Sequence, residues 1–126
     1  MMKYLGIDYG KKNVGVAVSD DGGNLAFAKT VLDNNEALLK NVLKICEEDK
    51  IEAIVMGESK NLNGEENLIQ KDILRFKKLL EENSDIPVHL DPAFLTSMEA
   101  RRLQEDVKKI DASAAALILK SYLEHV

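Results

Sequence analysis

The fold is decided by residues 3–18, which read KYLGIDYGKKNVGVAV. The first part, Lys3 to Asp8, has the character of a strand that ends in an acidic residue, and Tyr9 to Asn13 has that of a turn. The next residues, Val14 to Val18, alternate large apolar side chains with small ones, which predicts a second strand. We therefore expect an antiparallel pair of strands with the carboxylate of Asp8 close to their turn.

The remaining chain adds one more strand and then alternates helices with strands. A turn-rich segment, 19–24, precedes a third strand over 25–32, so the first three strands form an antiparallel meander. The later elements are expected to be a helix after the N-cap candidates Asp33 to Glu36, a strand over 51–57, a helix over 65–82, a strand over 86–90, and helices over 96–106 and 111–124. This order predicts one α/β domain over 1–126, with a five-stranded mixed sheet, parallel later strands, and helices on both faces.

Length and composition limit the classes of protein to which the chain can belong. Its 126 residues suffice for one core, and 45% hydrophobic with 31% charged residues is the balance of an ordinary globular domain. No apolar run approaches the roughly 20 residues that cross a bilayer, and the N-terminus lacks the pattern of a signal peptide. We expect the single Cys46 to be a buried thiol. These features predict a cytoplasmic protein that has no membrane partner.

Three acidic residues lie where the edge of a sheet can bring them together. Asp8 ends the first strand, Glu58 follows the fourth strand, which should neighbour the first, and Asp111 stands where the last helix begins. Mg²⁺ prefers hard oxygen ligands, and two such ions about 4 Å apart can support phosphodiester cleavage. Each residue also has an ordinary explanation, since Asp8 can start a turn, Asp111 can cap its helix and Glu58 can be an exposed loop residue. The net charge of −5 disfavours non-specific coating of nucleic acid but is compatible with such a metal site.

Four motifs, in order and with matching spacing, resemble one family over nearly the whole chain. They are GIDYGKKNVGVA at 6–17, GESKNLNG at 57–64, LTSMEA at 95–100 and DASAAALIL at 111–119. Together they resemble the small YqgF or RuvX-type pre-16S rRNA nucleases, a family also described as Holliday junction resolvase-like. The resemblance implies a ribonuclease H-like fold and a nuclease, a hydrolase that uses Mg²⁺ or Mn²⁺ to mature the 5′ end of 16S rRNA.

The acids of the family carry over only in part. Asp8 and Asp111 match family acids, but the glutamate that stands two positions before the Leu-Thr pair is Ala93 in this chain. Glu58, where the family has leucine, is the substitute that we favour slightly as the third catalytic residue and metal ligand, and Asp91 is another candidate. The alternative is a catalytically impaired RNA-binding or ribosome-assembly module that lost its acid at Ala93.

Basic and hydroxyl residues near these acids are the candidates for substrate binding. They are positioned to meet phosphates, although solvated surface charge is the ordinary explanation for each basic side chain. The candidates are Lys11, Lys12, Lys60, Thr96, Ser97 and Arg101. We expect the partner to be RNA, in the form of pre-rRNA, with branched DNA as the second candidate, and the protein to be a monomer or a homodimer.

Overall fold

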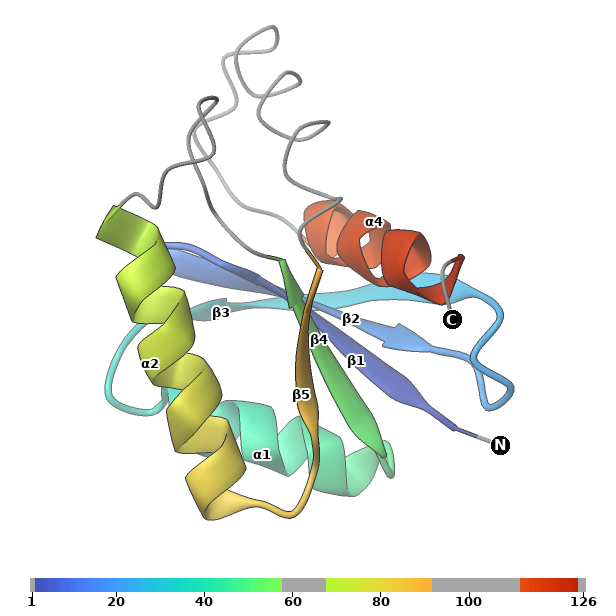
Figure 1. Ribbon diagram of the computed structural model, residues 1–126, viewed down its shortest axis with the longest axis horizontal. Helices are drawn as coiled ribbons and strands as arrows, with labels where there is room; N and C mark the ends of the chain where they lie inside the picture. The colour runs from blue at the N-terminus through green and yellow to red at the C-terminus, as the bar shows by residue number, and fades with distance from the viewer. Residues whose placement is uncertain (1, 58–67, 92–111, 125–126) are drawn as a thin grey trace, which may run out of the picture.

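A mixed sheet of five strands forms the centre of the computed structural model (Figure 1), which describes residues 2–57, 68–91 and 112–124. The strands are β1 (Tyr4–Tyr9), β2 (Asn13–Ser19), β3 (Ala26–Asp33), β4 (Ala53–Gly57) and β5 (Val88–Asp91). The helices within these ranges are α1 (Leu38–Glu48), α2 (Leu68–Asn83) and α4 (Ala112–Leu123). The helix predicted over 96–106 falls outside the described residues. In the described ranges, no helix combines the length and the apolar character that a membrane span requires.

The strand order in the sheet is β3-β2-β1-β4-β5. The first three strands pair antiparallel, which confirms the predicted meander. β4 pairs parallel with β1, and β5 pairs parallel with β4, as expected when helices connect the strands. The strand predicted over 51–57 begins only at Ala53, because the amide of Ile51 donates to the carbonyl oxygen of Cys46 at 2.9 Å and closes the end of α1.

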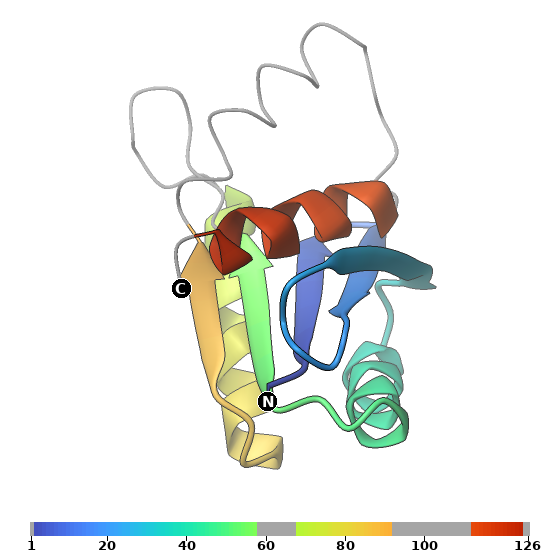
Figure 2. The same ribbon diagram turned by 90° about the vertical axis from the view of Figure 1, so that its right-hand side faces the viewer.

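Both faces of the sheet are apolar, and different helices cover them. Leu5 and Ile7 of β1 belong to the core beneath α1 and α2, whereas Tyr4 of the same strand packs on the α4 side. Figure 2 shows α4 and α2 on opposite sides of the sheet. Alternate residues of a strand point to opposite faces, so the short β1 serves both cores at once. The predicted covering of both faces by helices is confirmed.

The edge strand β3 is bent by a bulge and tied to α1. Val16 pairs with Thr30 but Ala17 pairs with Ala28, so Lys29 is an extra residue in β3. The Lys29 ammonium lies 2.9 Å from a carboxylate oxygen of Asp49 at the end of α1. A bulge and a charged residue are features that keep an exposed edge strand from pairing with another chain.

The start of α1 differs from the prediction that one of Asp33 to Glu36 caps it. The N-cap residue is Ala37, and no side chain forms a capping hydrogen bond there. The side chain of Asn35 instead accepts a hydrogen bond from the Ala37 amide at 2.9 Å, within the turn that leads into the helix. The predicted cap was therefore wrong, because these polar residues support the loop before the helix.

Candidate active site

Asp8 lies near the end of the central strand β1. It pairs with Gly15 of β2 and is only 6% exposed. Gly6, two residues earlier, faces α4, because a Cβ atom at Gly6 would stand 2.8 Å from the carbonyl oxygen of Ala115. Residues two apart share a face of a strand, so Asp8 points to the α4 side of the sheet.

Helix α4 lies close to β1 at Gly6. A Cβ at Gly6 would also stand 2.9 Å from the Cβ of Leu119, which leaves no space for any larger residue at this position. Ala115 is fully buried in the contact. The helix begins at Ala112, the residue after Asp111, while Asp111 itself falls outside the described residues. Close packing thus fixes the helix that follows the predicted acid.

The turn after β1 carries Lys11 and Lys12, and both are exposed. Asn34, at the end of β3, holds this turn in two places. Its side-chain amide donates to the carbonyl oxygen of Gly10 at 2.7 Å, and its backbone amide donates to the carbonyl oxygen of Lys12 at 2.9 Å. The sequence pattern indicates Asn34 only as a candidate helix cap, because its partner Gly10 lies 24 residues away along the chain. The result is a fixed turn that presents two ammonium groups beside the end of β1.

The ends of the three parallel strands are aligned, and a second carboxylate lies among them. Ile7 pairs with Met56, and Gly57 pairs with Asp91, the last residue of β5. Asp91 is 5% exposed. His89, two residues before it, stacks on Tyr122 of α4 with ring centroids 5.7 Å apart. Asp91 therefore faces the α4 side, as Asp8 does.

Tyr122 of α4 lies close to the carboxylate of Asp91 and to the ring of Tyr4. The pKa of the Tyr122 hydroxyl is raised, mainly by burial, and also by the nearby Tyr4 and by the negative charge of Asp91. The ring of Tyr4 contacts Tyr122 edge to face, with centroids 5.9 Å apart. The α4 side of β1 and β5 thus combines two buried carboxylates with an aromatic cluster.

Hard carboxylate oxygens of this kind fit Mg²⁺ or Mn²⁺. Residues 2–57, 68–91 and 112–124 contain no group of three His, Cys, Asp or Glu side chains that could hold a metal ion. They do contain Asp8 and Asp91, on one face of the sheet. Six other predicted site residues fall outside the described part of the chain, and so does Ala93, which stands where the family has glutamate. The six are Glu58, Lys60, Thr96, Ser97, Arg101 and Asp111.

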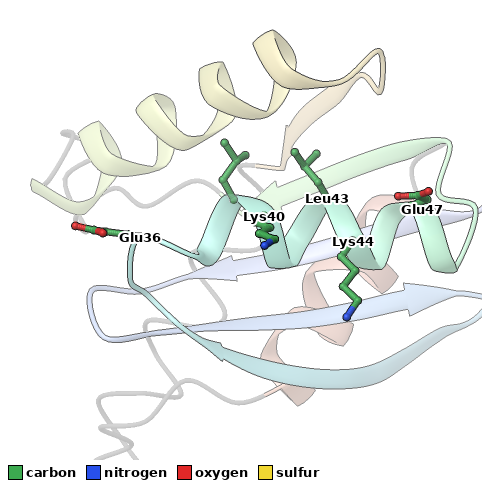
Figure 3. A pocket seen from close by; sticks show the side chains of 6 residues that line it. Glu36, Lys40, Leu43, Lys44 and Glu47 are labelled. Atoms are coloured by element: carbon green, nitrogen blue, oxygen red, sulfur yellow. The ribbon is translucent and has the colours of Figure 1, made fainter.

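A shallow groove on α1 is separate from this site. It has a volume of about 540 Å³ and is lined by Glu36, Leu39, Lys40, Leu43, Lys44 and Glu47. In Figure 3 the side chain of Leu43 points toward α2, and those of Lys40 and Lys44 project from other sides of the helix. Since α1 packs against the face opposite α4, this groove does not contact the face that carries Asp8.

The sheet order, the covering helices and the acid at the end of the central strand define the class of the protein, which is ribonuclease H-like. RuvC from Thermus thermophilus, solved in complex with a Holliday junction substrate, has the same fold with a TM-score of 0.63, at 16% identity over 99% of this chain and 95% of RuvC. The fowlpox virus Holliday junction resolvase superposes with a TM-score of 0.58 and is 15% identical in sequence. The match covers 99% of this chain and 100% of the resolvase. At these identities the likeness concerns the fold.

Sequence similarity assigns the family. Residues 2–125 match the RuvX family, which is described as Holliday junction resolvase, and the chain belongs to this family. A relative from Nitratidesulfovibrio vulgaris (strain Miyazaki F) is 35% identical over 97% of this chain and 93% of its own length. A relative from Clostridium botulinum (strain Eklund 17B) is 36% identical over 99% of this chain and 98% of its own length. Both carry the name "Putative pre-16S rRNA nuclease".

Proposed function

We propose that the protein is a metal-dependent nuclease that hydrolyses phosphodiester bonds of pre-16S rRNA in the cytoplasm. The observation that carries this proposal is the buried Asp8 at the end of the central strand, in a chain that belongs to the RuvX family over residues 2–125. A carboxylate at that position is held by the hydrogen bonds of β1 to both neighbouring strands, so its geometry is rigid.

The site residues divide into metal-binding and phosphate-binding groups. Asp8 binds the cation, and Glu58 and Asp111 are the further proposed ligands. When bound, Mg²⁺ or Mn²⁺ polarises the phosphodiester and makes water a stronger nucleophile at neutral pH. Lys11 and Lys12, exposed in the turn that Asn34 holds, attract the phosphates of the substrate and neutralise their charge.

The remaining substrate contacts are proposed from the sequence. Lys60, Thr96, Ser97 and Arg101 extend the phosphate-binding surface beyond the turn. Hydroxyl and basic side chains of this kind bind phosphate oxygens, which fixes the register of a nucleic acid without reading its sequence. RNA is the proposed substrate, and branched DNA is the second one to test.

The first prediction concerns Asp8→Asn, which keeps the size of the side chain and removes its charge. Stabilisation of the transition state by a metal is worth several kcal/mol, so we expect cleavage of a structured pre-16S rRNA with Mn²⁺ to fall by on the order of 100-fold or more. The matched control is Asp21→Asn. The side chain of Asp21 is 88% exposed in the turn after β2, so this variant should cleave RNA like the wild type. Unchanged cleavage by Asp8→Asn would remove the proposed mechanism.

The second candidate function is an RNA-binding or assembly module without catalysis, which Ala93 favours. Under this candidate the wild type binds RNA in a salt-sensitive manner and cleaves none. Ala93→Glu then separates the two views. A large gain in cleavage would indicate an impaired site, whereas no gain in an active enzyme would indicate that another carboxylate already serves.

A further inference from the structure

We propose that Asn34 is a positioning residue for the RNA substrate, because it holds the turn that carries Lys11 and Lys12 in the conformation that binds phosphate groups. Asn34 acts through the backbone of this turn and is not itself a contact of the RNA. The inference rests on the proposed function, in which the two lysines are phosphate-binding residues. It adds to that function a residue that follows the edge strand β3.

The turn that carries the lysines begins where the ladder between β1 and β2 ends. Tyr9 pairs with Val14, so the connection between the two strands begins at Gly10. Gly10 is buried, whereas Lys11 and Lys12 are exposed. A glycine has more backbone freedom to lose than any other residue, so a connection that begins with glycine needs further contacts to adopt one conformation.

Asn34 supplies these contacts from the end of β3. The pair between β2 and β3 that lies nearest to the turn joins Asn13 to Asp33. The backbone amide of Asn34 donates to the carbonyl oxygen of Lys12 at 2.9 Å, which extends this ladder by one residue into the turn. Its side-chain amide reaches further and donates to the carbonyl oxygen of Gly10 at 2.7 Å. A buried carbonyl group needs such a partner, so one residue holds the turn at two points.

A fixed turn matters for phosphate binding because a lysine side chain is itself flexible. Its ammonium group ends a stem of four carbons, and that stem must be ordered when a phosphate binds. If the backbone beneath the two lysines were also free, its ordering would weaken the binding of RNA further. The hydrogen bonds of Asn34 supply this order during folding, before RNA binds. Their loss should therefore lower the affinity for RNA.

The position of Asp8 does not depend on these hydrogen bonds. Asp8 pairs with Gly15 of β2, and the preceding Ile7 pairs with Met56 of β4, so two neighbouring strands fix this part of β1. The proposed metal ligand should thus stay in place when Asn34 is changed. The expected signature of a positioning role is therefore a higher KM with an unchanged kcat.

The test measures binding of a structured pre-16S rRNA fragment to the full chain by fluorescence anisotropy, in EDTA so that the RNA stays intact. Asn34→Ala removes the side-chain bond and keeps the backbone bond, and its Kd should rise by on the order of 5-fold or more. The matched control is Asn35→Ala, which removes the hydrogen bond from the amide of Ala37 in the same loop. Its Kd should equal that of the wild type, even where its melting temperature falls as far as that of Asn34→Ala.

A background without the two lysines shows whether Asn34 acts through them. In Lys11→Ala/Lys12→Ala, the further change Asn34→Ala should raise Kd by less than about 2-fold, because the groups that it positions are already gone. An undiminished effect in this background overturns the inference, and so does a wild-type Kd in Asn34→Ala alone. Should Asn34→Ala fail to fold, Asn34→Ser replaces it, since serine is common in turns and its shorter side chain lacks the amide donor. The same rise in Kd is expected from it, and a wild-type Kd overturns the inference.

The cleavage results separate the inference from the proposed function. If the wild type cleaves the RNA, Asn34→Ala should raise KM and keep kcat within about 2-fold, and a fall in kcat at unchanged KM overturns the inference. A wild type that binds RNA in EDTA but cleaves none with Mn²⁺ rejects the nuclease, and the Kd values still decide the inference. A wild-type Kd for Asn34→Ala in an active enzyme rejects the inference and leaves the nuclease in place. A wild type that binds no RNA overturns both.

Discussion

Cys46 is a thiol that the core keeps protonated. It lies on α1, is 4% exposed, and belongs to the apolar cluster between that helix and the sheet. Burial raises its pKa from 9.0 to about 11, and the negative charge of Asp49 contributes to the shift. Only the thiolate is a nucleophile, so the native protein should react slowly with thiol reagents at neutral pH. The residue acts as a small apolar side chain, as its helical position predicted.

Stability should therefore depend on pH through Cys46. Between about pH 9 and pH 11 the unfolded chain loses the thiol proton while the folded protein keeps it, so the folded state binds more protons and the free energy of unfolding falls as pH rises. The contribution is fully present below pH 9. Urea unfolding of the wild type and of Cys46→Ala measures it: the difference in free energy between them should decrease across this window. A difference that stays constant with pH would contradict the prediction.

Asp8, Asn34 and Asp91 differ in how far the sequence could predict their roles. Asp8 ends a strand between glycines, and this local pattern is sufficient to place it at the edge of the sheet. Asn34 acts through a bond to Gly10, which is 24 residues away, and local polarity cannot reveal such a partner. Asp91 shares an edge with Asp8 only because the register of three strands aligns them, and register depends on the folded sheet.

At the scale of elements, α4 and β1 approach each other so closely at Gly6 that no side chain fits between them. The small residues of α4 allow the approach, and Gly6 makes it possible from the sheet side, since the atoms nearest to a hypothetical Cβ include a backbone oxygen that cannot rotate away. The sequence predicted the helix over 111–124. It could not predict which strand position the helix would cross, because that depends on how the ridges of side chains on the helix fit the sheet.

Gly6→Ala should therefore destabilise the protein and displace α4. Overpacking of this kind costs about 1–3 kcal/mol of the free energy of unfolding, measured with urea. We also expect slower RNA cleavage, because α4 begins directly after Asp111. The matched control is Gly22→Ala, whose new Cβ would stand 3.0 Å from the side-chain amide nitrogen of Asn24, an exposed group that can move. Its cost should stay within about 0.5 kcal/mol. Equal free energies of unfolding for the two variants would show that α4 can shift away from a Cβ at position 6 at little cost.

At the scale of the whole molecule, one sheet connects two separate cores. The cluster beneath α1 and α2 contains Ile73, and the cluster beneath α4 contains Ile118; the two side chains are 2% and 0% exposed. The division of the buried residues between two faces follows from the topology of the sheet and not from the apolar pattern of any single element. Since each of β1 and β4 contributes to both cores, loss of either core should unfold the sheet that supports the other.

Ile73→Val and Ile118→Val test whether the protein unfolds as one unit. Each removes a single methylene from a buried site and should cost about 0.5–1.5 kcal/mol. Because the two sites lie on opposite faces without a shared contact, the double variant should lose the sum of the two within about 0.5 kcal/mol. Urea unfolding, followed by circular dichroism, should show a single transition with an unchanged slope in all three variants. Two separate transitions in the Ile118→Val variant would mean that α4 unfolds independently, and the sheet edge that carries Asp8 and Asp91 would then be exposed before the rest of the fold is lost.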